Sequence, residues 1–197
     1  MTSNQTAGEP STWPTVIGVL CLIYAVIGFL ANGCNGLWPW MQGPLLSMGG
    51  LKDVAFPSGL GFISMATGVV GFALAIVLLV AGLGVLRRRA KGFRLLRVWV
   101  IIKIVETAIG LALGLMLMDA QVEYQASIQD AMRELILERG GDASAVPEQS
   151  ADDAKRSTLM SIIIIGPLAF VFPVVIGLCA TKKSWREDVD GWEDSVA

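Results

Sequence analysis

The sequence predicts an all-α fold: an integral membrane four-helix bundle whose third helix continues beyond the outer membrane surface. The chain of 197 residues is 54% hydrophobic and only 16% charged, whereas a soluble domain carries about 25% charged residues. Its charges are gathered into blocks, which leaves four apolar stretches near the roughly 20 residues that a helix needs to cross a bilayer. After the third stretch, residues 119–139 contain neither Gly nor Pro and favour helix throughout.

These features divide the chain into nine segments. We expect a cytoplasmic N-terminal segment (1–12), a first span (13–33), an outer loop rich in Gly, Pro and Trp (34–61), a second span (62–86), a basic cytoplasmic link (87–97), a third span (98–118), an outer polar segment (119–157) with a helix to about residue 139, a fourth span (158–180) and an acidic cytoplasmic tail (181–197). Gly140 and Gly141 are typical helix terminators, and Asp152, Asp153 or Ser157 can cap the fourth span.

Basic residues indicate how the chain is oriented. The link between the second and third spans carries six of them, the tail adds three, and the longer loops of the other side hold five. The positive-inside rule therefore places both termini in the cytoplasm, and we expect a plasma membrane location, the inner membrane of a bacterium. The link either holds anionic headgroups or only sets the topology; its expected headgroup contacts are Arg87, Arg88, Arg89, Lys91 and Arg94.

Tryptophans near the ends of the spans are expected to anchor the protein at the membrane surface. These are Trp13, Trp38, Trp40, Trp99 and Trp185. For the pair in the outer loop, an aromatic docking surface or lid is the alternative. In the tail, Trp185, Val189 and Trp192 share one helical face, which favours a short helix on the membrane or in a partner's groove. Gly191 and the acidic residues of the tail favour disorder instead.

A lysine and a glutamate interrupt the third span. Lys103 is close enough to the cytoplasmic end for its ammonium to reach the headgroups, whereas Glu106 is too deep and too short. The i, i+3 spacing makes a pair between the two geometrically possible. Because Lys103 can leave for the surface instead, we expect Glu106 to find another donor, among Thr107, Tyr24, Thr67 and Ser64, or to be protonated. Three roles remain open for Glu106: a structural lock between helices, a contact to a partner subunit or cofactor, and a carrier of protons or cations.

Small residues are expected to bring the spans together, because hydrophobicity does not drive helix association within lipid. The third span has Gly110 and Gly114 as GxxxG, and the other spans carry similar stripes. The motif serves either packing within the bundle or dimerisation. The apolar stripe of the projecting helix (Ile128, Met132, Leu135) must likewise be covered, by the outer loop, by a second copy or by another subunit.

The sequence lacks the usual chemistry of a soluble enzyme. It has no histidine and three cysteines far apart in the chain, so we expect no catalytic site, no metal and no cofactor. A net charge of −2 gives no reason to expect a nucleic-acid partner. The leading hypothesis is a non-enzymatic accessory, structural or assembly subunit of a larger membrane complex, with the lipid bilayer and other membrane subunits, or a homo-oligomer, as partners. The alternative is a small channel or carrier that uses Glu106 for protons or cations.

Overall fold

The computed structural model describes residues 11–51, 54, 56–142 and 150–193. Within these ranges the chain forms six α-helices and no strand: α1 (Trp13–Met48), α2 (Ser58–Leu86), α3 (Ala90–Met116), α4 (Met118–Glu138), α5 (Ala151–Thr181) and α6 (Lys183–Glu193). By length and composition, α1, α2, α3 and α5 are apolar enough to cross a membrane. The predicted all-helical fold with four long apolar helices is thus confirmed. Most of the expected N-terminal segment, residues 1–10, lies outside the described residues, as do 143–149 and 194–197.

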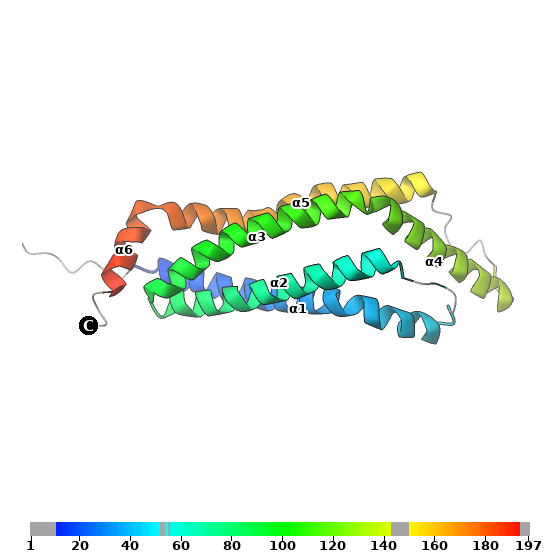
Figure 1. Ribbon diagram of the computed structural model, residues 1–197, viewed down its shortest axis with the longest axis horizontal. Helices are drawn as coiled ribbons and strands as arrows, with labels where there is room; N and C mark the ends of the chain where they lie inside the picture. Colours follow the sequence, from blue (N-terminus) through cyan, green and yellow to red (C-terminus); the bar gives the residue numbers. More distant parts are fainter. Residues whose placement is uncertain (1–10, 52–53, 55, 143–149, 194–197) are drawn as a thin grey trace, which may run out of the picture.

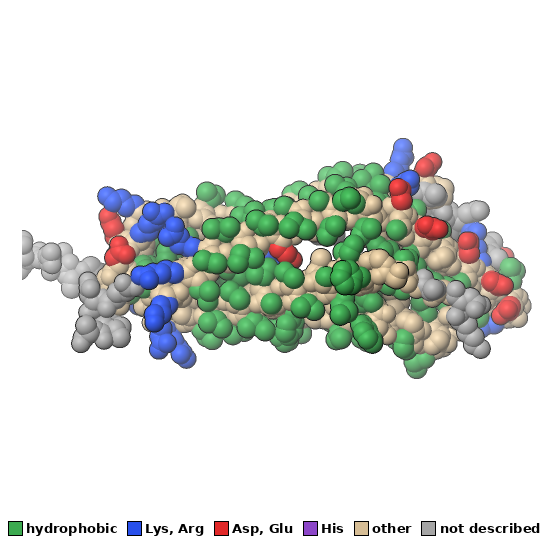
Figure 2. Space-filling view, viewed as in Figure 1, with side chains coloured by type: hydrophobic (Ala, Val, Ile, Leu, Met, Phe, Trp, Pro, Cys, Tyr) green, Lys and Arg blue, Asp and Glu red, His purple; other side chains and the backbone are tan. Residues whose placement is uncertain are grey.

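The four long helices form two hairpins that diverge (Figure 1). Helix α2 lies along α1, and α3 pairs with α2 near one end and with α5 farther along. We call the end that carries residues 87–97 the basic end, and the opposite end, where α1 meets α4, the distal end. Helix α6 folds across the basic end, and α4 runs from the end of α3 back toward α1. Basic side chains gather at the basic end, and a broad hydrophobic band separates them from the acidic residues of the distal end (Figure 2).

The hydrophobic core occupies the basic half of the bundle. Its largest fully buried side chain is Trp99, which is 1% exposed and donates its indole N–H to the carbonyl oxygen of Leu74 at 2.9 Å. Trp99 is therefore a core residue and not the surface anchor that its position suggested. The rest of the cluster comes from all the helices except α4: Ile17, Cys21, Ala25, Leu74, Leu78, Ala81, Val85, Ala90, Phe93, Leu96, Val100, Ile176, Ala180, Val189 and Trp192.

Glycines allow the helices to approach closely in two places. A Cβ added at Gly84 of α2 would lie 2.6 Å from Cα of Gly92 in α3. A Cβ at Gly68 of α2 would lie 2.5 Å from Cα of Gly36 in α1. Real Cβ atoms do not come this close to backbone, so only glycine permits these crossings. Each of these two crossings thus depends on a glycine pair.

Helix α1 is longer than the sequence suggested. Residues 34–48, expected to begin the outer loop, continue the helix through Pro39 and Pro44 to Met48. Each proline removes one backbone hydrogen bond, but the helix continues past both of them. The helix ends at Met48, and Gly50, two residues on, has a φ of 94°, in the left-handed region that glycine favours. The expected outer loop is therefore helical in its first half.

Other element boundaries also differ from expectation. Helix α3 begins at Ala90 and not at residue 98, because Phe93 and Leu96 are buried while the basic residues around them face outward. Only residues 87–89 separate α2 from α3. At its far end α3 breaks at Leu117, and α4 then runs to Glu138, just before Gly140 with φ 73°.

The cap of α5 and the form of the tail are further differences. The N-cap is Ser150, whose hydroxyl accepts from the backbone N–H of Asp153 at 3.1 Å, so none of the three expected residues has that role. The tail, for which disorder was an open alternative, forms α6 as far as Glu193. Val189 and Trp192 are 6% and 7% exposed because they pack on the basic end of the bundle itself.

Candidate functional site

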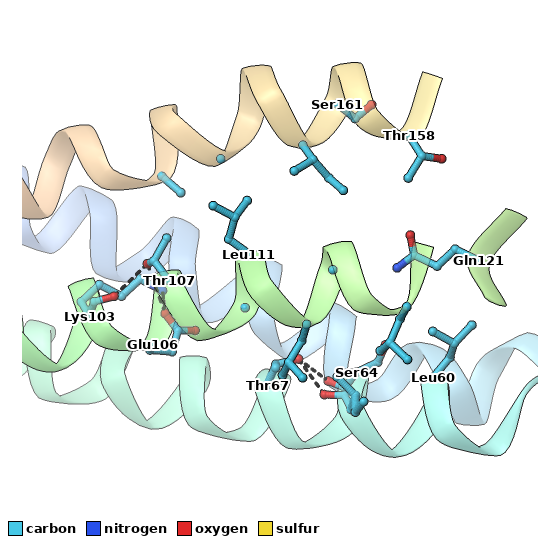
Figure 3. Close-up of a pocket in the computed structure, with 18 residues that line it drawn as sticks. Leu60, Ser64, Thr67, Lys103, Glu106, Thr107, Leu111, Gln121, Thr158 and Ser161 are labelled. Carbon is cyan, nitrogen blue, oxygen red and sulfur yellow. Dashed lines mark hydrogen bonds and ion pairs between the residues drawn. The ribbon is translucent and has the colours of Figure 1, made fainter. Parts of the chain in front are cut away.

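A cavity of about 510 Å³ lies between α2, α3 and α5, in the distal half of the molecule, outside the main hydrophobic core. Figure 2 shows the surface hollowed at this place, with an acidic side chain in the middle of the hydrophobic band. The lining is mainly apolar, but polar side chains reach it from four helices (Figure 3): Ser64, Thr67, Lys103, Glu106, Thr107, Gln121, Thr158 and Ser161. Cavities of this size and lining are typical of binding sites.

Lys103 and Glu106 form an ion pair at the end of the cavity nearer the core. The Nζ of Lys103 is 2.7 Å from Oε2 of Glu106, and the side chains are 15% and 19% exposed. Thr107 lies beside them, with its hydroxyl 3.4 Å from the same carboxylate oxygen. Contrary to expectation, Lys103 does not extend toward the basic end. Its neighbour three residues on, on the same helical face, offers the nearer counter-charge.

The other expected partners of Glu106 are engaged elsewhere. The Tyr24 ring stacks on Phe172 with centroids 4.1 Å apart, and the Thr67 hydroxyl donates to the carbonyl oxygen of Ile63 at 2.8 Å. Among the described residues, Oε1 of Glu106 has no hydrogen-bond donor. In Figure 3 the carboxylate lies on the side of α3 that faces α2 across the cavity. One acceptor of the ion pair is thus available to whatever occupies the cavity.

Lys103 also borders a second, much smaller cavity. This one measures about 20 Å³ and is lined by Tyr24, Asn32 and Trp99 among others. Its size suits a single water molecule. Asn32 packs against Gly71 and donates its amide to the carbonyl oxygen of Gly28 at 2.6 Å. The ion pair therefore stands at the boundary between the closely packed half of the bundle and the open half.

The GxxxG motif of α3 faces the large cavity. Gly110 and Gly114 both line it, and a Cβ at either position would meet nothing within 4 Å among the described residues. Among the described residues, the two glycines therefore make no close contact with a neighbouring helix. Their small face is unoccupied, unlike that of Gly84 and Gly92.

Helix α4 closes the distal side of the cavity. Gln121 lines the cavity, and Tyr124 accepts a hydrogen bond from the amide of Gln42 in α1. Tyr124 also packs edge-on against Phe56, with centroids 5.0 Å apart. Lys155 of α5 pairs with Asp119 at 2.8 Å. Helix α4 thus packs in part against its own chain, while Met132 of its apolar stripe is 40% exposed, so the alternatives for that stripe stay open.

The predicted tryptophan anchors fall into three groups. Trp38 and Trp40 are 49% and 72% exposed on α1. Trp13 and Trp185 stack on each other with centroids 4.2 Å apart, and Trp13 donates its indole N–H to Asp188 at 2.7 Å. Trp99 is in the core. Sequence spacing identified the apolar face of α6, but not that Trp13 is its partner, since the two lie at opposite ends of the chain.

The remaining predicted contacts lie at the basic end. The five basic residues expected at lipid headgroups are exposed, and Arg88 donates to the carbonyl oxygen of Ser11 at 3.0 Å.

No cluster of metal-ligating side chains occurs within the described ranges. A comparison of the chain with protein families, with curated proteins and with solved structures finds no match.

Proposed function

We propose that this chain is a non-enzymatic, four-span membrane protein that acts as an accessory or assembly subunit of a larger complex. In this proposal α1, α2, α3 and α5 cross the plasma membrane as a helix bundle. The basic end and both termini are cytoplasmic, because the exposed basic residues gather there. Helix α4 then lies at the outer surface, folded onto the end of α1 by the contact between Tyr124 and Gln42.

One observation carries the proposal: the bundle is closely packed in its basic half and open in its distal half. In the apolar 18-residue segment of each long helix, the share of residues that is buried within the chain is only 11% for α3 and 12% for α5. The corresponding shares are 28% for α1 and 39% for α2. The open half contains an ion pair in which Oε1 of Glu106 has no donor, and a glycine face with no close neighbour, among the residues that the structure describes. Lipid tails cannot hydrogen-bond to a carboxylate, so a protein partner is the better complement to this half.

Native purification tests the proposal. After gentle extraction from native membranes, native-gel sizing and mass spectrometry should find the chain migrating with the same second membrane protein in independent preparations. A chain that migrates alone under all mild detergents would contradict the subunit role.

The orientation in the membrane is tested by replacing the native cysteines and placing a single cysteine at Ser184 or at Glu138. A membrane-impermeant maleimide should label intact cells or spheroplasts at Glu138→Cys and not at Ser184→Cys.

A second candidate function is the passage of protons or cations. It is supported by the polar side chains that line the cavity between Glu106 and the outer surface, among them Thr67, Ser64 and Gln121. The nearby ammonium of Lys103 opposes a bound cation, which makes this the weaker candidate. In reconstituted vesicles a pathway would lose its flux on Glu106→Gln. Wild-type vesicles without flux would eliminate it.

A further inference from the structure

We propose that α2 and α3 bind an anionic phospholipid at the basic end, with its phosphate on Arg87, Lys91 and Arg94 and an acyl chain along the exposed apolar side of α3. The inference rests on the four membrane spans of the proposed function and not on the partner subunit. Of the two roles left open for the basic link, it favours headgroup binding over a topology signal alone.

The exposed side of α3 changes from basic to apolar along the helix. Lys91, Arg94, Val98, Ile102 and Val105 recur every three or four residues and therefore share one side of it. The two basic residues are exposed, and the three apolar ones are 45–52% exposed. Cations and apolar side chains thus follow one another in the order in which a phospholipid presents its phosphate and its acyl chain.

The apolar part of this side is as long as one leaflet is thick. From Val98 to Ile109, which is also exposed, it extends about 16 Å at 1.5 Å per residue. One leaflet is half of a hydrocarbon core that is about 30 Å thick. A lipid whose chain covers this part of α3 therefore has its phosphate at the level of Arg94 and Lys91.

Helix α2 adds a third cation in the same way. Its apolar side chains precede Arg87 at spacings of three and four residues and are 37–52% exposed: Ile76, Val80 and Leu83. The two helices touch at Gly84 and Gly92, and only residues 87–89 connect them, so Arg87 lies close to Lys91. Figure 2 shows basic side chains along this edge of the hydrophobic band.

These cations are available to a phosphate. Among the described residues, no carboxylate lies within ion-pair distance of Arg87 or Lys91. Two acidic side chains of α6, at the same end, have other partners: Asp188 accepts from an indole N–H, and Glu187 pairs with Lys183 at 3.6 Å. Arginine and lysine bind phosphate oxygens through charge-assisted hydrogen bonds, and basic clusters of this kind on membrane helices bind anionic headgroups.

Helix α1 is an internal contrast. It also exposes apolar side chains near the basic end, for example Ile23, which is 53% exposed. However, residues 11–51 contain no lysine or arginine. The lipid beside α1 therefore has no cation of that helix at its headgroup, and the two surfaces can be compared within one molecule.

Photo-crosslinking in defined bilayers tests the site. A benzophenone amino acid replaces Val98 or, as the matched control, Ile23, which is exposed to the same degree (52% and 53%). The purified protein is reconstituted with equal amounts of phosphatidylglycerol and phosphatidylcholine, and mass spectrometry counts the lipid adducts. The ratio of anionic to zwitterionic adducts should be at least about fivefold higher at Val98, the effect of one basic residue at an anionic surface. Equal ratios at the two positions would overturn the proposal.

Two double variants separate the position of the charges from their number. Lys91→Gln with Arg94→Gln should lower the ratio at Val98 to that at Ile23. Lys183→Gln with Arg186→Gln removes the same charge from the same end and should leave the ratio unchanged. An equal loss in both would show that only the net charge of this end matters, which would overturn the site. Thermal unfolding verifies that each variant folds.

A last comparison distinguishes a lipid from a soluble anion. Excess inorganic phosphate should leave the phosphatidylglycerol adducts at Val98 unchanged, whereas their complete loss would show that the cations take a soluble phosphate instead. All these outcomes are independent of co-purification, so failure of the lipid site would leave the subunit role intact. Release of the chain from native membranes by alkaline carbonate would instead contradict the four spans on which both proposals rest.

Discussion

At the scale of single residues, the turn between α2 and α3 is built on an arginine in an unfavourable conformation. Arg88 has φ 51°, in the left-handed region where a Cβ is strained. Its backbone N–H bonds to Val85 at 3.0 Å, and that of Arg89 bonds to Gly84 at 2.9 Å. This is the hydrogen-bond pattern of a helix C-terminus that usually has glycine at the strained position.

Replacing this arginine by glycine should therefore stabilise the isolated protein. We expect Arg88→Gly to raise the free energy of unfolding by about 0.5–1 kcal/mol, because glycine removes the strain. The exposed hydrogen bond of Arg88 to Ser11 offsets only a small part of this gain. Arg87→Gly is the matched control: Arg87 has φ −84°, so glycine there only adds entropy to the unfolded chain and should destabilise. Thermal unfolding in one detergent compares the two, and equal shifts would contradict the argument.

The ion pair of α3 should respond differently to single and double substitutions. Glu106→Met leaves the ammonium of Lys103 without its partner, and we expect a loss of about 1–3 kcal/mol. This is less than the roughly 3–5 kcal/mol for a fully buried pair, because both side chains are partly exposed. Adding Lys103→Met removes the unpaired charge and should restore most of the loss. Unfolding measurements on the three variants check this, and a double variant less stable than the single one would refute it.

These residues also show what the sequence could predict. Glu106 stands out because a carboxylate deep in an apolar helix requires a partner, and that inference needed no structure. A pair with Lys103 was geometrically possible but was not the expected outcome, because a lysine near a membrane surface has two low-energy directions and the sequence does not distinguish them. Trp99 was misplaced for a similar reason. Tryptophan suits both an interface and a core that offers its N–H an acceptor, and the acceptor here, the carbonyl oxygen of Leu74, is 25 residues away in the sequence.

At the scale of elements, the ends of helices were harder to predict than their existence. Pro39, Pro44 and the neighbouring glycines are typical of a loop, yet α1 continues through them. The amphipathic face of α6 was readable from spacing, but its contact surface was not. That surface is Trp13 and Phe93 of the same chain, with ring centroids of Trp13 and Trp192 5.5 Å apart. Contacts between distant segments leave no local pattern in a single sequence.

The attachment of α6 depends on Trp13, and its removal should release the helix. Trp13→Ala removes the stacking contacts with Trp185 and Trp192 and the hydrogen bond to Asp188. Each aromatic pair contributes about 0.5–1.5 kcal/mol. We expect trypsin to cleave after Lys182 and Lys183 about tenfold faster in this variant, measured by loss of a C-terminal tag from reconstituted protein. Trp40→Ala, at a 72% exposed ring, is the control. Equal cleavage rates in both variants would show that α6 does not depend on Trp13.

At the scale of the whole molecule, four apolar helices were predictable and their uneven packing was not. Hydropathy reports how much apolar surface a helix has, but not whether the chain or its surroundings cover that surface. Small residues were equally ambiguous. The sequence has 22 glycines, and only the structure shows which of them bring helices together. Gly84 and Gly92 do so in the packed half, whereas Gly110 and Gly114 line the large cavity.

This contrast predicts opposite responses to the same small substitution. Gly84→Ala and Gly68→Ala would each place a methyl group within 2.6 Å of backbone in a neighbouring helix, and overpacking of this kind costs about 1–3 kcal/mol. Gly110→Ala meets open space and gains helix propensity of up to about 1 kcal/mol, so the isolated chain should be unchanged or more stable. Thermal unfolding of the purified monomer compares the three variants. If Gly110→Ala destabilised as much as Gly84→Ala, α3 would have to contact a neighbouring helix there, and the outer half of the bundle would be closed without a partner.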